Sequence, residues 1–101
     1  MPLKVTALLF GEARDLAGTK SLVVGIPRDT CALPDFLHAL HEAAGGKLSG
    51  KVLMASAGGG VSLAPGYKIM INKGILNPRD AKDVILKDAD EVGILPPFSG
   101  G

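Results

Sequence analysis

The sequence contains a single cysteine, Cys31, among its 101 residues. One thiol cannot form an intrachain disulfide, and it cannot supply the several cysteine ligands of a structural zinc site or an iron–sulfur cluster. A ferredoxin-type protein is therefore excluded. A chain without a disulfide framework is typical of a reducing compartment, so we predict a cytoplasmic location.

An excess of charge of one sign is also lacking. Eleven basic and ten acidic residues leave a formal net charge of +1, whereas a nucleic-acid-binding surface needs a basic excess. No apolar run approaches the roughly 20 residues that cross a bilayer, and the N-terminal residues show no signal-peptide cleavage pattern. We therefore expect no nucleic-acid partner and no association with a membrane.

The hydrophobic content of 47% is sufficient for one compact core, and we predict a single domain over residues 1–101. Alternating or β-branched patterns predict strands, separated by segments rich in glycine and polar residues. We expect residues 11–18 to form a loop and residues 45–66 to form a long connection with room for one short element. The expected strands cover residues 3–10, 20–26, 67–71 and 91–95.

A helix is predicted from Leu33, because apolar residues then recur at spacings of three and four. Asp29 or Thr30 is the expected N-cap, Pro34 is compatible with the first turn, and the pair Gly45–Gly46 is the expected stop. The residues expected on the buried helical face are Leu33, Phe36, Leu37, Leu40 and Ala44.

One main helix across one face of a mixed sheet gives an α+β layer arrangement. The order of two strands, a helix and two further strands fits more than one fold of this class, so the pattern predicts the class and leaves the topology open.

The most informative segment is the extended tail expected over residues 96–101, Pro-Pro-Phe-Ser-Gly-Gly. Pro96 and Pro97 cannot donate the hydrogen bonds of a sheet, and they favour an extended backbone. Gly100 and Gly101 have no side chains and can enter a channel too narrow for any other residue. We therefore expect the prolines to end the last strand and the flexible glycines to be held by a partner.

The terminal carboxylate of Gly101 is ionised at neutral pH and is an unhindered oxygen nucleophile. Its attack on the α-phosphorus of ATP would give an acyl-adenylate. A sulfur nucleophile would convert that adenylate into a thiocarboxylate, and an amine would convert it into an amide. Both steps need cations and oxyanion donors that the tail lacks, so an activating enzyme must supply them.

Three segments resemble the MoaD/ThiS family of ubiquitin-like sulfur carriers: LLFGEARDLAG near the N-terminus, KIMIN in the middle, and LKDADEVGILPPFSGG at the end. The double proline before the diglycine is most similar to the small subunit of molybdopterin synthase. The family often has glycine at the position of Ala89, and alanine is strained there if that turn needs positive φ. The turn at residues 72–74 also differs from the usual Asn-Gly, and residues 45–66 match no part of the family.

The resemblance implies a β-grasp fold and the role of a sulfur carrier in molybdenum or tungsten cofactor biosynthesis. Gly101 would carry the adenylate and then the thiocarboxylate, and the chain would be no enzyme by itself. It would bind no cofactor, because the ATP is used by the activating enzyme. The implied partners are an E1-like adenylating enzyme, a sulfur-donor protein and a larger catalytic synthase subunit.

Partner contacts are expected from the tail and from one aromatic residue near the first strand. Phe98 follows the prolines, and Phe10 precedes a glycine-bearing loop; each side chain is equally consistent with an interface anchor or with packing. The predicted partner-binding residues are Phe10, Pro97, Phe98, Ser99 and Gly100.

Other local patterns carry weaker functional readings. Residues 45–51 fit part of a phosphate-binding loop, but Val52 stands where Ser or Thr should follow, so we favour a plain loop. His38 and His41 share a helical face without further ligands, and a structural role is favoured over a metal site. For Cys31, packing near the helix start is favoured over a pKa lowered by the helix dipole.

Two other classes of function remain open at this point. The chain could be a related carrier for thiamin, cysteine or tRNA thiolation, or a modifier conjugated to lysines, because these chemistries start from the same adenylate. It could also be a β-grasp binding module with an accidental diglycine.

Overall fold

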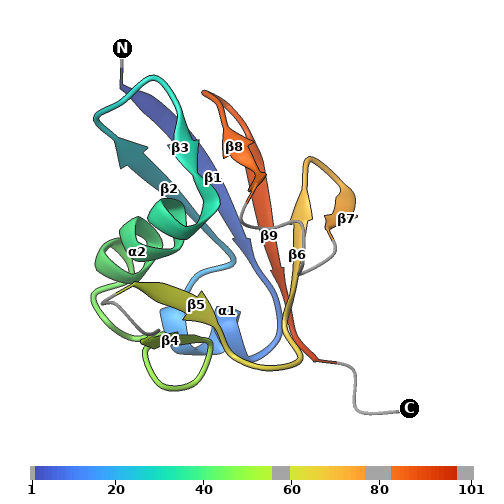
Figure 1. Cartoon of the computed structure of the whole chain (residues 1–101). Coiled ribbons are helices and arrows are strands. Elements are labelled where there is room, and N and C mark those ends of the chain that lie inside the picture. Colours follow the sequence, from blue (N-terminus) through green and yellow to red (C-terminus); the bar gives the residue numbers. More distant parts are fainter. Residues whose placement is uncertain (1, 56–59, 77–82, 98–101) are drawn as a thin grey trace.

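A computed structural model describes residues 2–55, 60–76 and 83–97. Its main feature is a five-stranded mixed sheet with the order β2-β1-β9-β6-β7 (Figure 1). The central strands β1 and β9 run parallel, and the other neighbours run antiparallel. The strands are β1 (Leu3–Leu9), β2 (Ser21–Ile26), β6 (Lys68–Ile71), β7 (Gly74–Leu76) and β9 (Glu91–Leu95).

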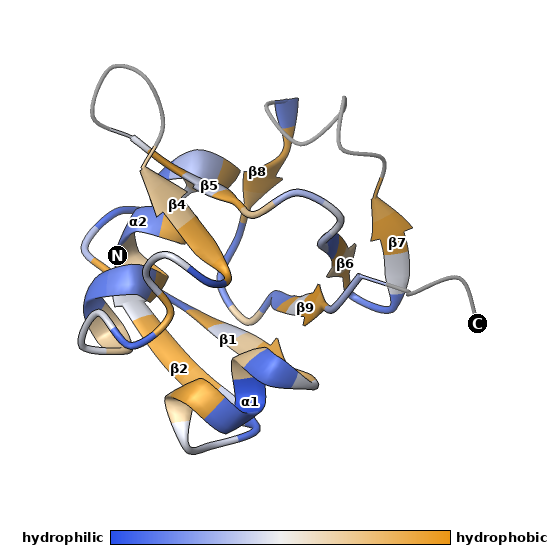
Figure 2. Ribbon diagram, turned by 90° about the horizontal axis from the view of Figure 1, so that it is seen from below, coloured by the Kyte–Doolittle hydropathy of each residue, from blue (hydrophilic) through white to orange (hydrophobic). Residues whose placement is uncertain are grey.

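The main helix, α2 (Leu33–Ala43), lies across one face of this sheet (Figure 2). Leu33, Phe36, Leu37 and Leu40 are buried, as the spacing predicted. They share one hydrophobic core with the buried side chains of β1, which alternate along the strand at Leu3, Val5, Ala7 and Leu9. The α+β arrangement, the helix and its buried face are thus confirmed.

Shorter elements fill the connections. The segment expected as a loop after β1 contains a helix, α1 (Glu12–Ala17), which ends at Gly18 with a left-handed φ of 76°. The long connection after α2 holds the antiparallel pair β4 (Leu53–Ala55) and β5 (Val61–Leu63). A further pair joins β3 (Cys31–Ala32) to β8 (Ile85–Leu86).

The N-cap of α2 is Ala32, so the prediction of Asp29 or Thr30 is wrong. The physical reason is the pairing of β3 with β8, which carries the chain in an extended conformation up to the first helical residue. The N–H of Leu33 donates to the carbonyl of Val84 at 3.2 Å. The Val84 carbonyl therefore accepts a hydrogen bond from the first N–H of the helix, which a capping side chain would otherwise satisfy.

The turns expected at residues 72–74 and 88–90 are both present. Ala89 has a φ of 71°, so alanine occupies the positive-φ position that the family often fills with glycine. Side chains brace the two turns against each other: Asn72 Oδ1 accepts from the N–H of Glu91 at 2.9 Å, and Asn72 Nδ2 donates to Asp90 Oδ1 at 3.1 Å. None of the helices in the described ranges is long and apolar enough to cross a membrane.

Candidate functional site

The tail leaves the domain at the end of β9. This strand ends at Leu95, directly before Pro96, as predicted. Because β9 runs parallel to β1, the tail base lies at the same end of the molecule as α1 and the turn between β5 and β6 (Figure 1). Of the predicted site residues, Phe98, Ser99, Gly100 and Gly101 lie outside the described residues, and Pro97 and Phe10 lie within them.

Two glycines meet the two prolines of the tail base. A Cβ atom built on Gly11 would fall 3.1 Å from Cγ of Pro96, and one built on Gly66 would fall 2.8 Å from Cβ of Pro97. Both glycines have positive φ, 59° at Gly11 and 88° at Gly66. The backbone of two separate loops therefore approaches Pro96 and Pro97 closely. At Gly66 the approach leaves no room for a Cβ, and at Gly11 a Cβ would be tight against Pro96.

The residues after these two glycines are joined by a hydrogen bond. The hydroxyl of Tyr67 donates to Oε1 of Glu12 at 3.1 Å, so the loop that starts α1 is tied to the loop that starts β6. Tyr67 is buried, with 8% of its surface exposed. Burial and the hydrogen bond to the Glu12 carboxylate raise the pKa of the Tyr67 phenol. We call Gly11, Glu12, Gly66 and Tyr67 the collar of the tail.

Sequence reasoning missed the collar. Glu12 and Tyr67 are 55 positions apart, and no periodic pattern links them. The signals that could have drawn attention to it are the glycines before each residue and the fact that Tyr67 is the only tyrosine of the chain.

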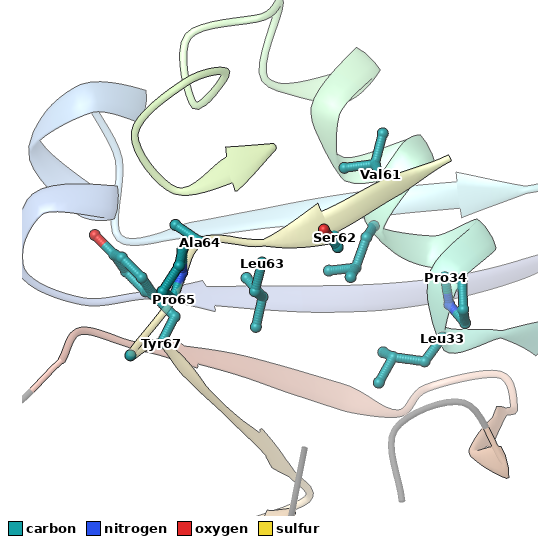
Figure 3. Close-up of a pocket in the computed structure, with 10 residues that line it drawn as sticks. Leu33, Pro34, Val61, Ser62, Leu63, Ala64, Pro65 and Tyr67 are labelled. Carbon is teal, nitrogen blue, oxygen red and sulfur yellow. The ribbon is translucent and has the colours of Figure 1, made fainter. Parts of the chain in front are cut away.

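Tyr67 and Gly66 also line an apolar cavity of about 400 Å³ between the start of α2 and β5. Leu33, Pro34 and Leu63 form other parts of its wall. Figure 3 shows the Tyr67 ring at one end of this cavity with its hydroxyl oxygen directed away from the cavity. The phenol therefore turns its apolar body to the cavity and its polar tip to Glu12.

The face of the sheet opposite α2 carries an apolar patch beside the tail base. Pairing places Leu8 next to Gly93, Gly93 next to Met70, and Met70 next to Ile75. A Cβ on Gly93 would fall 3.1 Å from Cε of Met70 and 3.5 Å from Cε2 of Phe10, so both side chains close over this glycine. Phe10 is 38% exposed and Ile75 is 69% exposed. We call Leu8, Phe10, Met70 and Ile75 the open-face patch.

The weaker candidates have ordinary structural roles. His38 Nε2 lies 3.2 Å from Oε1 of Glu42 on the exposed side of α2. Across residues 2–55, 60–76 and 83–97, no three His, Cys, Asp or Glu side chains gather where they could hold a metal. Cys31 is buried, as the favoured reading of a packed side chain predicted. Burial and the nearby Asp35 carboxylate raise the pKa of its thiol.

Several solved structures of archaeal proteins have the same fold. Small archaeal modifier protein 1 from Methanosarcina acetivorans is 26% identical with a TM-score of 0.70, over 100% of this chain and 99% of that one. The protein of the same description from Haloferax volcanii is 22% identical with a TM-score of 0.75, over 97% and 99%. A putative molybdopterin converting factor, subunit 1, from Pyrococcus furiosus is 22% identical with a TM-score of 0.63, over 95% and 99%. No curated protein matches the sequence.

These likenesses establish a ubiquitin-like β-grasp fold, the class of protein in which a mixed sheet is crossed by one main helix. The model of the ThiS family matches residues 7–101, which include the collar, the open-face patch and residues 96–101 of the tail. The chain belongs to the ThiS family and is a small ubiquitin-like sulfur carrier.

Proposed function

We propose that the chain is the sulfur-donating small subunit of a molybdopterin synthase. The observation that carries this proposal is the tail Pro96-Pro97-Phe98-Ser99-Gly100-Gly101, which follows the central strand β9. The match to the ThiS family and the likeness to a putative molybdopterin converting factor subunit support it.

Loading takes place at the carboxylate of Gly101. One carboxylate oxygen attacks the α-phosphorus of ATP, pyrophosphate leaves, and an acyl-adenylate forms. A donor protein then delivers sulfur in the oxidation state of hydrosulfide, and this sulfur attacks the acyl carbon. The new carbon–sulfur bond replaces the carbon–oxygen bond to AMP, which departs. The E1-like enzyme binds the ATP and provides the cations and oxyanion donors, so the carrier itself needs no cofactor.

Delivery requires that the carrier dock on a larger subunit while its tail enters an active site. The open-face patch is an exposed apolar surface of the kind that marks protein interfaces, and it lies beside the tail base. Phe10 in this patch and Phe98 in the tail are the aromatic anchors. The diglycine passes where side chains cannot. The thiocarboxylate sulfur attacks an electrophilic carbon of the pterin precursor and displaces an oxygen there as water. Hydrolysis of the resulting thioester then leaves the sulfur on the pterin and regenerates the Gly101 carboxylate.

The decisive experiment is mass analysis of the C-terminal peptide of carrier isolated from its own cells. A thiocarboxylate adds about 16 Da, the same as oxidation of Met or Cys, so the shift must be localised to Gly101. Removing Gly101, or adding one residue after it, is expected to abolish ATP-dependent adenylation while the fold survives. Normal adenylate formation by the truncated chain contradicts the proposal.

A second candidate is a protein modifier conjugated to lysines, and the likeness to two small archaeal modifier proteins favours it. Both candidates pass through the same adenylate, so the next acceptor distinguishes them. Carrier preloaded with a thiocarboxylate and mixed with the large subunit and precursor should lose its sulfur in a single turnover. Carrier incubated with its activating enzyme, ATP and cell protein should instead become joined to lysines by an isopeptide bond if it is a modifier. Because Lys87 is the last basic residue, tryptic peptides of the targets would then carry residues 88–101 on the modified lysine.

Sulfur delivery to thiamin, cysteine or tRNA is the remaining alternative within the family. A preloaded carrier that transfers sulfur to one of these acceptors and not to the pterin precursor would reassign the pathway without changing the role of Gly101.

A further inference from the structure

The collar combines three observations that packing of the core does not require. Two positive-φ glycines from separate loops meet the two prolines of the tail base. The residue after each glycine takes part in one hydrogen bond, from the Tyr67 hydroxyl to the Glu12 carboxylate. The apolar ring of Tyr67 is already buried against the domain, so the bond to an exposed carboxylate adds little to the core.

We propose that Glu12 and Tyr67 are positioning residues, whose hydrogen bond holds the loops of Gly11 and Gly66 against Pro96 and Pro97 and so fixes the direction in which the tail leaves the domain. The inference rests on the proposed carrier function, because a fixed direction matters only if a partner must receive the tail.

The physical reason lies in the length of the tail. Only four residues, 98–101, separate the collar from the reacting carboxylate. A segment of this length reaches at most about 14 Å, so a small change of direction at its base moves the carboxylate out of an active site. A tail held at its base also loses less conformational entropy when it is bound.

The collar is continuous with the docking surface. Phe10 belongs to the open-face patch, Gly11 touches Pro96, and Glu12 receives the hydrogen bond from Tyr67. Three consecutive residues therefore connect the surface that docks, the base of the tail and the bond that closes the collar. When a partner binds the open-face patch, the base of the tail therefore has a fixed position relative to the partner's active site.

The first test removes the donor or the acceptor. Tyr67→Phe deletes only the hydroxyl, and Glu12→Ala deletes the acceptor. Glu12→Gln keeps an amide oxygen that accepts the same bond and should rescue function. Asp15→Ala is the matched control, because Asp15 is another exposed carboxylate in the first turn of α1 and pairs only with Arg14 among the contacts of the described residues, at 3.8 Å.

The readout is steady-state adenylation of full-length carrier by its activating enzyme. For Tyr67→Phe and Glu12→Ala we expect KM for the carrier to rise roughly fivefold to thirtyfold, which corresponds to ordering about one further backbone residue on binding. We expect kcat to stay within about twofold, because the bound tail is the same chemical group. Glu12→Gln and Asp15→Ala should keep the unmodified KM.

A second readout does not depend on any enzyme. Nuclear Overhauser contacts between Gly66 and Pro97, and between Gly11 and Pro96, should weaken in Tyr67→Phe and persist in Glu12→Gln, while the amide shifts of the sheet stay unchanged. Contacts and KM both unchanged in Tyr67→Phe would overturn the positioning role. If the unmodified carrier is not adenylated at all, the proposed function fails, and the contacts alone then decide whether the collar holds the tail base.

Discussion

Gly66 and Pro97 lie so close together that a Cβ atom on Gly66 would fall 2.8 Å from the Cβ of Pro97. Contacts between real Cβ atoms are essentially never this short, so any side chain at Gly66 must displace the tail base or the turn that carries the glycine. The turn between β5 and β6 is thus shaped to accept the first residues of the tail.

Gly66→Ala should therefore lower the free energy of unfolding and also impair adenylation. Alanine at a φ of 88° is strained by roughly 1–2 kcal/mol, and the contact with Pro97 redirects the tail. Gly18→Ala is the control, because Gly18 has a φ of 76° but nothing within 4 Å of its built Cβ. In chemical denaturation, Gly18→Ala should lower the free energy of unfolding because of the strained φ. Its adenylation should remain normal. Equal adenylation by both variants would contradict the role of the Gly66 contact.

Tyr67 provides a spectroscopic prediction. The chain has one tyrosine and no tryptophan, so ultraviolet difference absorbance of the phenolate reports Tyr67 alone. Because burial and Glu12 raise its pKa in the folded state, its titration midpoint should lie above the ordinary value of 10. Glu12→Gln should lower the midpoint by removing the negative charge, and Asp15→Asn should leave it unchanged.

The same pKa shift gives a pH dependence of stability. A phenol with a raised folded pKa contributes stability that is fully present below the unfolded pKa, about 10. As the pH rises through the folded pKa, this contribution is lost, because the unfolded chain has already released its proton. Denaturation at rising alkaline pH should therefore show a decline in stability that is smaller in Tyr67→Phe. An identical decline in both proteins would show that Tyr67 is not the group responsible.

The sequence predicted the elements whose pattern repeats within one segment. Alternation located β1, and the spacing of Leu33, Phe36 and Leu40 located α2. The turn at residues 88–90 located the start of β9. The short helix α1 was missed because its six residues make less than two turns and bury only Ala13. The pair β3 and β8 was missed because two residues in each strand carry no period.

The candidate site divides in the same way. The chemistry of the tail could be inferred from its last six residues, because it depends on residue types in one place. The collar could not, because Glu12 and Tyr67 are 55 positions apart and come together only when β1 and β6 both pair with β9. Local sequence does not encode such a contact.

At Ala89 the family resemblance predicted strain if the turn needs positive φ, and the structure has φ at 71°. Ala89→Gly should raise the free energy of unfolding by about 1 kcal/mol, since the relief of strain at positive φ exceeds the entropy that glycine adds to the unfolded chain. Ala43→Gly, at the exposed last residue of α2, should in contrast lower stability. Thermal or chemical denaturation of the two variants checks the opposite signs. A loss of stability in Ala89→Gly would mean that the turn is not strained.

If the carrier docks through the open-face patch, truncating a side chain inside the patch should lower partner affinity more than truncating an exposed side chain outside it. Phe10→Ala should weaken binding to the activating enzyme or the large subunit by roughly 1–3 kcal/mol, the range for an aromatic anchor. Val23→Ala is the control, because Val23 is 64% exposed but lies on the edge strand β2, outside the patch. Isothermal titration with the full-length proteins measures both. Equal affinities for the two variants would place the interface elsewhere.

The last prediction separates docking from sulfur delivery within the tail. Phe98→Ala removes an apolar anchor and should weaken docking on the large subunit by about 1–3 kcal/mol. Gly100→Val leaves the open-face patch, the collar and Phe98 in place, so docking should remain largely intact. Its β-branched side chain should nevertheless stop sulfur transfer, because the diglycine has to pass through a channel that admits only backbone. Affinity is measured for each variant, and single-turnover transfer is measured separately from carrier preloaded with thiocarboxylate, so that a defect in loading does not appear as a defect in delivery. Transfer by Gly100→Val at the unmodified rate would mean that the large subunit has no narrow channel, and the diglycine would then serve the activating enzyme alone.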